Sequence, residues 1–166
     1  MKIRILALAA LTFTLATFAL QSIAEGVVPP PDGGYPGFNT AEGQNALKNL
    51  TTGSGNTAVG WYSIFSATTA SLNTGVGAGA LALNIAAQNT ATGAGALLSN
   101  TTGDNNTANG AFALFSNTEG ILNTATGSNA LFSNTTGDDN VAVGYQALYH
   151  NTTGGDQHGG WLAGAL

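Results

Sequence analysis

Few side chains in this sequence belong to the types that carry out acid–base or metal chemistry. The chain has two histidines, His150 and His158, and no cysteine, which excludes a thiolate nucleophile, a thiolate metal site and a disulfide. His150 stands where the equivalent segments of the chain usually carry serine, which favours a solvent-facing substitution over a catalytic base. No nucleophile, base and oxyanion donor can be assembled from these residues. The sequence therefore predicts that the protein is not an enzyme.

Two other patterns partly resemble known ligand sites, one for Ca²⁺ and one for phosphate. Asp104 and the pair Asp138-Asp139 lie in turn-like segments and would bind Ca²⁺ if several turns converged, but the glycine–aspartate pattern of calcium-binding rolls is absent. The glycine-rich run at residues 75–79 lacks the spacing, the lysine and the helix of a phosphate-binding loop. We favour solvated turn charges and a glycine-rich coil, and predict no metal and no cofactor. Sequons recur too, and we attribute them to the repeat rather than to glycan acceptance: Asn49, Asn100, Asn105, Asn134 and Asn151.

The composition excludes whole classes of partner. Charged residues form 7% of the 166-residue chain, against about a quarter in a typical soluble domain. The only basic residues are Lys2, Arg4 and Lys48, against eight carboxylates. Phosphate backbones and anionic membrane surfaces are bound by clustered Lys and Arg. We therefore predict neither nucleic-acid binding nor binding to anionic membranes.

The N-terminal residues predict export. Residues 1–24 combine Lys2 and Arg4, an apolar run and small residues before Glu25, the pattern of a secretory signal peptide. The alternative, an uncleaved anchor, is disfavoured because the run is short for a membrane span. Residues 25–38, with the run Pro29-Pro30-Pro31 and a Gly-Gly pair, predict a linker or an N-terminal cap. We expect a secreted or cell-surface protein without a membrane span after cleavage.

Residues 39–156 consist of a repeat of about seventeen residues, with one copy of sixteen. The consensus is N-T-A-x-G-x-x-A-L-x-x-N-T-T-G-x-x, whose positions we number as columns one to seventeen. Such a period is too short for a helical hairpin and suits one coil of a β-solenoid. We predict an all-β, parallel β-solenoid of about seven coils with two short strands per coil, Asn-Thr-Ala-x-Gly and Ala-Leu-x-x-Asn. Residues 157–166 are predicted to form a C-terminal tail.

The invariant columns then have structural roles. Stacked asparagines can hydrogen bond from coil to coil, so we predict a structural ladder in column one: Asn39, Asn56, Asn73, Asn89, Asn106, Asn123 and Asn140. A second ladder is possible in column twelve, from Asn84 to Asn151. We predict that column nine fills the core: Leu47, Ile64, Leu81, Leu97, Leu114, Leu131 and Leu148. Column-fifteen glycines such as Gly103 are expected to supply a positive φ in the turn.

Column ten cannot line the interior of a coil together with column nine if the second strand is extended. In an extended second strand, columns nine and ten face opposite sides, and only one side can line the coil. Column ten is therefore a candidate interface: Phe65, Leu98, Phe115, Phe132 and Tyr149. Aromatic residues in columns six and seven extend it: Trp61, Tyr62, Phe112 and Tyr145. The alternative is that a bend in the strand brings both stripes inside. An exposed stripe of this length would indicate self-association.

The motifs at residues 56–60, 89–93, 123–127 and 140–144, of the form Asn-Thr/Val-Ala-Val/Thr-Gly, resemble the head repeats of YadA-like trimeric autotransporter adhesins. The longer pattern also resembles repeats of other secreted bacterial proteins and of tail fibres. The resemblance covers residues 39–156 and implies a left-handed β-roll, a homotrimer and attachment to host or matrix surfaces. The repeats of that family are a few residues shorter, and a stalk and a membrane anchor follow them. Neither is recognisable after residue 156, so we expect release, a partner or assembly.

Two functions follow as hypotheses. The first is a non-catalytic structural protein that self-assembles into an extracellular or cell-surface fibre, because the repeats run almost to the C-terminus without an evident polar cap. The second is the binding head of a trimeric adhesin. Both require a homo-oligomer, as a filament or a trimer, and the second adds a surface or matrix ligand.

Overall fold

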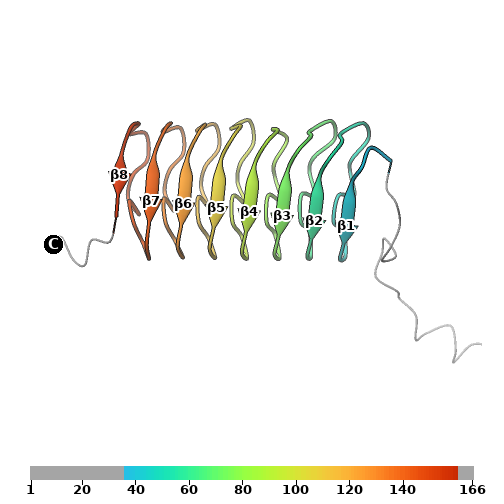
Figure 1. Ribbon diagram of the computed structural model, residues 1–166, viewed down its shortest axis with the longest axis horizontal. Helices are drawn as coiled ribbons and strands as arrows, with labels where there is room; N and C mark the ends of the chain where they lie inside the picture. Colours follow the sequence, from blue (N-terminus) through green and yellow to red (C-terminus); the bar gives the residue numbers. More distant parts are fainter. Residues whose placement is uncertain (1–35, 161–166) are drawn as a thin grey trace, which may run out of the picture.

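The computed structural model describes residues 36–160, which form a parallel β-solenoid with one strand per coil (Figure 1). The predicted signal peptide and the tail from residue 161 lie outside the described residues, as do residues 25–35 of the linker. The strands are β1 (Thr40–Glu42), β2 (Thr57–Val59), β3 (Thr74–Val76), β4 (Thr90–Thr92), β5 (Thr107–Asn109), β6 (Thr124–Thr126), β7 (Val141–Val143) and β8 (His158–Gly159). They form one eight-stranded sheet in sequence order. The predicted fold class is confirmed, and strand pairing continues beyond residue 156 into β8.

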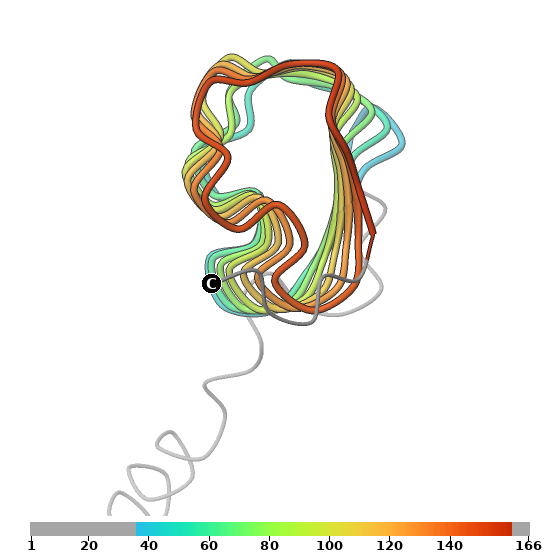
Figure 2. The same cartoon turned by 90° about the vertical axis from the view of Figure 1, so that its left-hand side faces the viewer.

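Each strand covers columns two to four, and its side chains alternate between the interior and solvent. Column three, usually alanine, is buried in every strand from β1 to β7. Columns two and four are rich in threonine and valine, which favour strands because of their β-branched side chains. The register places equivalent columns opposite each other at every pairing, for example Thr90 beside Thr107. The coils therefore lie almost directly over one another when viewed along the solenoid (Figure 2).

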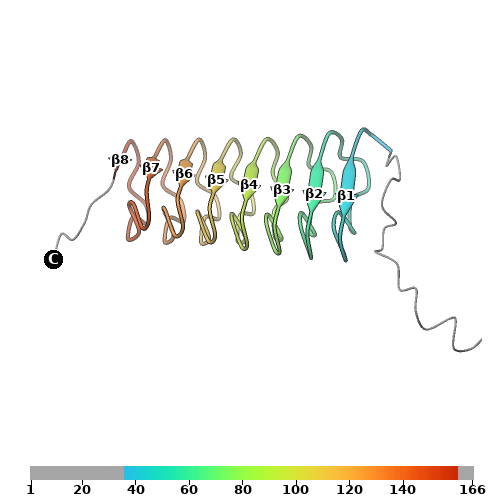
Figure 3. The ribbon, with the colours of Figure 1, turned by 60° about the horizontal axis from the view of Figure 1, so that its bottom comes forward.

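The second strand that we predicted in each coil is not present. The Ala-Leu-x-x-Asn segment forms consecutive tight turns opposite the strand wall (Figure 3), with bonds such as Asn117 N–H to the Leu114 carbonyl at 3.2 Å. The reason is local backbone geometry. Columns seven and nine have positive φ, as at Phe112 (57°) and Leu114 (51°), which no extended strand allows. Backbone bonds still join these turns from coil to coil, as between Leu114 N–H and the Ala130 carbonyl at 3.0 Å.

The turn geometry also changes which columns face inward. Columns eight and nine are both buried from coil to coil, as at Ala113 and Leu114, which are 0% exposed. Alanine is small enough for the two to share the interior, and leucine fills the remaining space. A left-handed backbone costs a non-glycine residue about 1–2 kcal/mol, while burying a leucine side chain stabilises by about 1.5–3 kcal/mol. Burial therefore holds column nine in a conformation that leucine rarely adopts.

The column-fifteen glycines do not have the positive φ that we predicted. They are required for close packing instead. A Cβ atom on Gly120 would lie 2.5 Å from both the Asn117 Oδ1 and the Gly137 carbonyl oxygen of the next coil. The positive φ of this turn lies two residues later, in column seventeen, as at Leu122 (57°) and Asp139 (55°).

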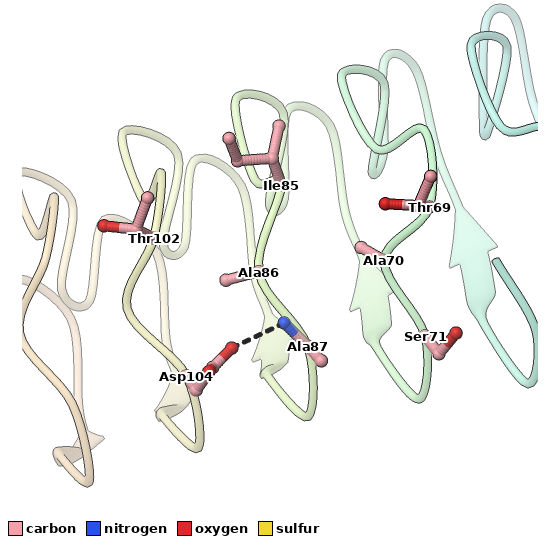
Figure 4. Close-up of a pocket in the computed structure, with 8 residues that line it drawn as sticks. All are labelled: Thr69, Ala70, Ser71, Ile85, Ala86, Ala87, Thr102 and Asp104. Atoms are coloured by element: carbon pink, nitrogen blue, oxygen red, sulfur yellow. Dashed lines mark hydrogen bonds between the residues drawn. The ribbon is translucent and has the colours of Figure 1, made fainter.

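The sixteen-residue coil lacks its residue in the turn between Asn84 and Ala86. The Asn84 side chain reaches the carbonyl two residues later, at 2.8 Å, whereas Asn100 reaches the carbonyl three residues later at the same distance. A shallow hollow of about 420 Å³ lies beside this turn (Figure 4). The shortened turn is thus absorbed at the surface, without displacing the strands on either side.

One group of side chains shows that neighbouring columns are matched to each other. Gly75 replaces the usual column-three alanine, and a Cβ there would lie 2.6 Å from the Ser63 Oγ and 2.8 Å from the Ile64 Cγ1. Ser63 in turn replaces a column-eight alanine, and its buried hydroxyl donates to the Gly75 carbonyl at 2.9 Å. The hydroxyl therefore occupies the space that the missing methyl group leaves.

We predict that Gly75→Ala destabilises the protein by about 1–3 kcal/mol, because it overpacks the interior. Combining it with Ser63→Ala and Ile64→Leu restores the usual residues and should recover most of that loss. Leucine also relieves strain, since a β-branched residue at a φ of 47° is a conformational outlier. Urea midpoints of the four proteins (wild type, Gly75→Ala, the Ser63→Ala/Ile64→Leu variant and the triple variant) measure the coupling. Effects that add within about 0.5 kcal/mol would contradict this prediction.

Candidate functional site

The first-column asparagines form a continuous hydrogen-bonded system inside the solenoid. All seven are buried. At every step the Oδ1 atom of one asparagine accepts the backbone N–H of the next, at 2.8–3.0 Å. Four steps add a side-chain amide bond between the two asparagines. Each Nδ2 also donates across its own coil to the column-fifteen carbonyl, at 2.8–2.9 Å.

A second asparagine ladder occupies column twelve from the third coil onward. The amides of Asn84, Asn100, Asn117, Asn134 and Asn151 join at 2.6–3.0 Å. In the first two coils this column holds Leu50 and Ala67, so the ladder begins at Asn84. Both ladders are internal, which makes them elements of stability rather than surfaces for recognition. Asn100 and Asn134 are 0% exposed, so their sequons are closed to a glycosylating enzyme in the folded chain.

The predicted column-nine residues lie in the core. Leu47, Ile64, Leu81, Leu97, Leu114 and Leu131 are buried, and Leu148 packs against the cluster while partly buried. With the asparagines they fill the coil interior between them.

The column-ten residues are half-buried rather than fully exposed. Phe115, Phe132 and Tyr149 stack in parallel, with ring centroids 5.1 and 5.0 Å apart. The turn geometry accounts for this, because column ten leans along the solenoid against the next coil instead of projecting from a strand. Within the repeats, the more exposed aromatic residues are those of columns six and seven: Trp61 (56% exposed), Phe112 (43%) and Tyr145 (62%); Phe38, which precedes the first coil, is exposed as well.

We call the residues of both groups the aromatic flank: Trp61, Tyr62, Phe65, Phe112, Phe115, Phe132, Tyr145 and Tyr149. They gather in two clusters. Trp61, Tyr62 and Phe65 contact each other at 4.4 and 4.6 Å between ring centroids, and the remaining rings lie on the fifth to seventh coils. Small residues such as Ala78 and Ala94 occupy column six between the clusters. Aromatic contacts of this kind contribute about 0.5–1.5 kcal/mol per pair beyond area burial.

The turn carboxylates have a structural role that the sequence reasoning missed. The Asp104 Oδ1 accepts the Ala87 N–H of the preceding coil at 2.7 Å (Figure 4), and the Asp138 Oδ1 accepts the Ile121 N–H at 2.7 Å. Ser71 does the same for Ser54 at 3.0 Å. The repeated spacing of one coil between these side chains and their partners is the signal that could have found them.

The histidine and acidic side chains are spread along the described coils. Within residues 36–160, no three His, Asp or Glu side chains gather closely enough to hold a metal ion. His150 is exposed and lies edge-on to Tyr149, with ring centroids 4.9 Å apart. His158 is exposed on β8. Over the same residues, the structure contains no helix of the length and apolarity needed to cross a membrane.

No protein-family model matches the sequence, and no curated protein or solved structure matches it either.

Proposed function

We propose that this chain is a non-catalytic structural protein that is exported and self-assembles into an extracellular or cell-surface fibre. The observation that carries the proposal is the aromatic flank. Three large aromatic side chains on it are between 43% and 62% exposed, and half-buried rings stack beside them from coil to coil. Surfaces with gathered, exposed aromatic groups are typical of interfaces between proteins.

The architecture adds a second route of association, along the solenoid axis. Within the described residues, β1 and β8 each pair on one side only. Unpaired strand edges are templates for another strand, and the parallel register that joins one coil to the next would serve between chains as well. Few charged side chains would have to be buried in such contacts, since charged residues form 7% of the chain. Lateral contact through the aromatic flank and axial contact through the edges together would give a fibre.

The test is assembly of the full chain, purified after export by the expression host. We expect Trp61→Ser/Phe112→Asn/Tyr145→Ser to assemble far less than the wild type, because the exposed aromatic groups of the aromatic flank are gone. The same columns carry Ser128 and Asn129 in another coil, so the replacements suit this backbone, including the positive φ of column seven. Light scattering and negative-stain electron microscopy measure the change.

The control removes apolar surface elsewhere. Leu72 and Leu122 are 61% and 49% exposed in column seventeen, where Asn105 occurs naturally. The Leu72→Asn/Leu122→Asn variant should assemble as the wild type does. A wild-type protein that remains a monodisperse monomer would refute self-assembly. Equal loss in both variants would show that the aromatic flank is not the interface.

The second candidate function is the binding head of a trimeric adhesin, which the sequence resemblance suggested. The observation that favours it is the position of the aromatic flank along the side of the solenoid, because lateral contacts can close into a ring of three. A discrete species of three chains in light scattering would favour the head, whereas long filaments favour the fibre.

A further inference from the structure

The solvent face of the sheet carries an unbroken row of threonines. Column two is threonine in six consecutive strands, and the pairing sets each one directly beside the next: Thr40, Thr57, Thr74, Thr90, Thr107 and Thr124. A parallel row runs in column four, and five of its seven residues are β-branched: Glu42, Val59, Val76, Thr92, Asn109, Thr126 and Val143. All of these side chains are exposed or partly exposed. We call the two rows the threonine face.

The column-two hydroxyl groups differ from other threonine hydroxyls of the described coils in their hydrogen bonding. Within residues 36–160, no hydrogen bond joins any of the six column-two hydroxyls to another protein group. The threonines of column thirteen behave differently, since Thr101, Thr118 and Thr135 donate to a carbonyl of the next coil at 2.8–3.1 Å. The column-two hydroxyls are therefore directed at solvent or at a ligand. β-branching suits threonine and valine alike to these strands, so propensity accounts for the side-chain shape but not for the hydroxyl groups.

The geometry of the threonine face is that of a two-dimensional lattice. Neighbouring strands lie about 4.8 Å apart, and columns two and four, two residues apart on one strand, are separated by about 6.6 Å. β-branched side chains are restricted at χ1, so their methyl and hydroxyl groups have few alternative positions. The asparagine ladders and backbone bonds beneath the sheet fix the spacing of the rows. A ligand that repeats in the same two directions would meet the same groups at every step.

The near absence of charged residues on the threonine face limits the kind of ligand that it could bind. On the described strands, the acidic and basic residues of this face are Glu42 on β1 and His158 on β8, at its two ends. The strands between them carry none. A phosphate, a nucleic acid or an acidic peptide has no charged counterpart there. A hydroxyl group both donates and accepts a hydrogen bond, so the complement of this face is an uncharged surface that does both at regular intervals.

We propose that the threonine face binds the surface of crystalline water. Water molecules in ice both donate and accept hydrogen bonds, carry no net charge and repeat at close to the spacing of neighbouring strands. The alternating methyl groups hold the intervening water in order rather than binding it strongly. This inference does not rest on the proposed assembly, because the aromatic flank belongs to columns six, seven and ten.

The test uses the full chain after export. Thr90 and Thr107 lie on the central strands β4 and β5, and Thr90→Tyr/Thr107→Tyr places two rings that protrude from the lattice. The matched control is Thr136→Tyr, which changes an exposed threonine in a turn. The readouts are the gap between melting and freezing temperatures of a single ice crystal, the shape of that crystal, and partition of the protein into slowly growing ice.

We expect the wild type and the Thr136→Tyr control to shape ice crystals and to enter growing ice, and the Thr90→Tyr/Thr107→Tyr variant to lose more than half of the temperature gap. Circular dichroism checks that each variant folds. If the tyrosine variant does not fold, Thr90→Ser/Thr107→Ser retains the hydroxyls without the methyl groups and should lose part of the gap. A wild type that neither shapes ice nor enters it overturns the proposal. So does a face variant that is as active as the control.

Discussion

Replacing Gly110 with alanine is expected to destabilise the solenoid by more than about 4 kcal/mol, a size reached only by a few mechanisms. Gly110 has a φ of 140°, which L-residues rarely adopt. The new Cβ would also lie 2.6 Å from the carbonyl carbon and oxygen of Gly127 in the next coil. Those atoms are backbone, held by the same column in every coil, so they cannot move aside as a flexible side chain would.

Urea unfolding followed by circular dichroism measures the effect of Gly110→Ala. Gly160→Ala is the matched control, because Gly160 is exposed, has no positive φ and a Cβ there would meet no atom within 4 Å. We expect the control to stay within about 1 kcal/mol of the wild type, as surface substitutions usually do. A Gly110→Ala protein with the same stability as the control would show that column five does not require glycine.

The second large effect is expected at Asn123. Its Oδ1 accepts from both the backbone and the side chain of Asn140, at 3.0 and 2.9 Å. Its Nδ2 donates to the Asn106 Oδ1 at 3.1 Å and to the Gly137 carbonyl at 2.8 Å. Asn123→Ala leaves the buried Asn140 N–H without its acceptor, and each such loss costs about 1–3 kcal/mol. With the cavity added, we expect a loss of about 3–5 kcal/mol.

The isosteric Asn123→Asp variant tests whether the polarity or the shape of this side chain matters. Burial disfavours the charged carboxylate and raises its pKa in the folded protein above the unfolded value. The folded state then binds the proton more tightly, so the variant should lose further stability as the pH rises from 4 to 7. Asn109→Ala, at an exposed strand position, is the control and should change little. An Asn123→Asp protein whose stability, relative to wild type, is independent of pH would contradict this expectation.

The period of the repeat was sufficient to predict most of the fold. Seven copies in phase predicted a parallel solenoid, the asparagine column predicted a ladder, and the leucine-rich column nine was predicted to fill the core, where the structure places it. The second segment of each coil could not be predicted in the same way. Leucine seldom adopts the positive φ seen at Leu97 (50°), so local propensity favoured a strand. Contacts with the coils above and below override that propensity, and they are invisible in a single repeat.

The candidate surfaces could also be predicted only in part from the sequence. Residue types alone singled out the aromatic columns, but their exposure depended on the unpredicted turns, which leave Phe132 half-buried and Tyr145 exposed. The threonine face needed only the register, yet threonine in a strand is ordinary by propensity. What distinguishes this face is its hydrogen bonding: within residues 36–160 the column-two hydroxyls have no partner in the protein, whereas those of column thirteen do.

The second asparagine ladder begins only at the third coil, so the two ends of the solenoid differ in their cross-links. Leu50 and Ala67 occupy column twelve in the first two coils, and amide-to-amide bonds in that column begin at Asn84. Each coil of a solenoid is stabilised chiefly by its immediate neighbours, so the coils with fewer cross-links open first when the chain fluctuates. Under tension, the coils at the β1 end would unfold first, while the coils from the third onward remained folded. Such a rod yields progressively from one end instead of breaking at its centre.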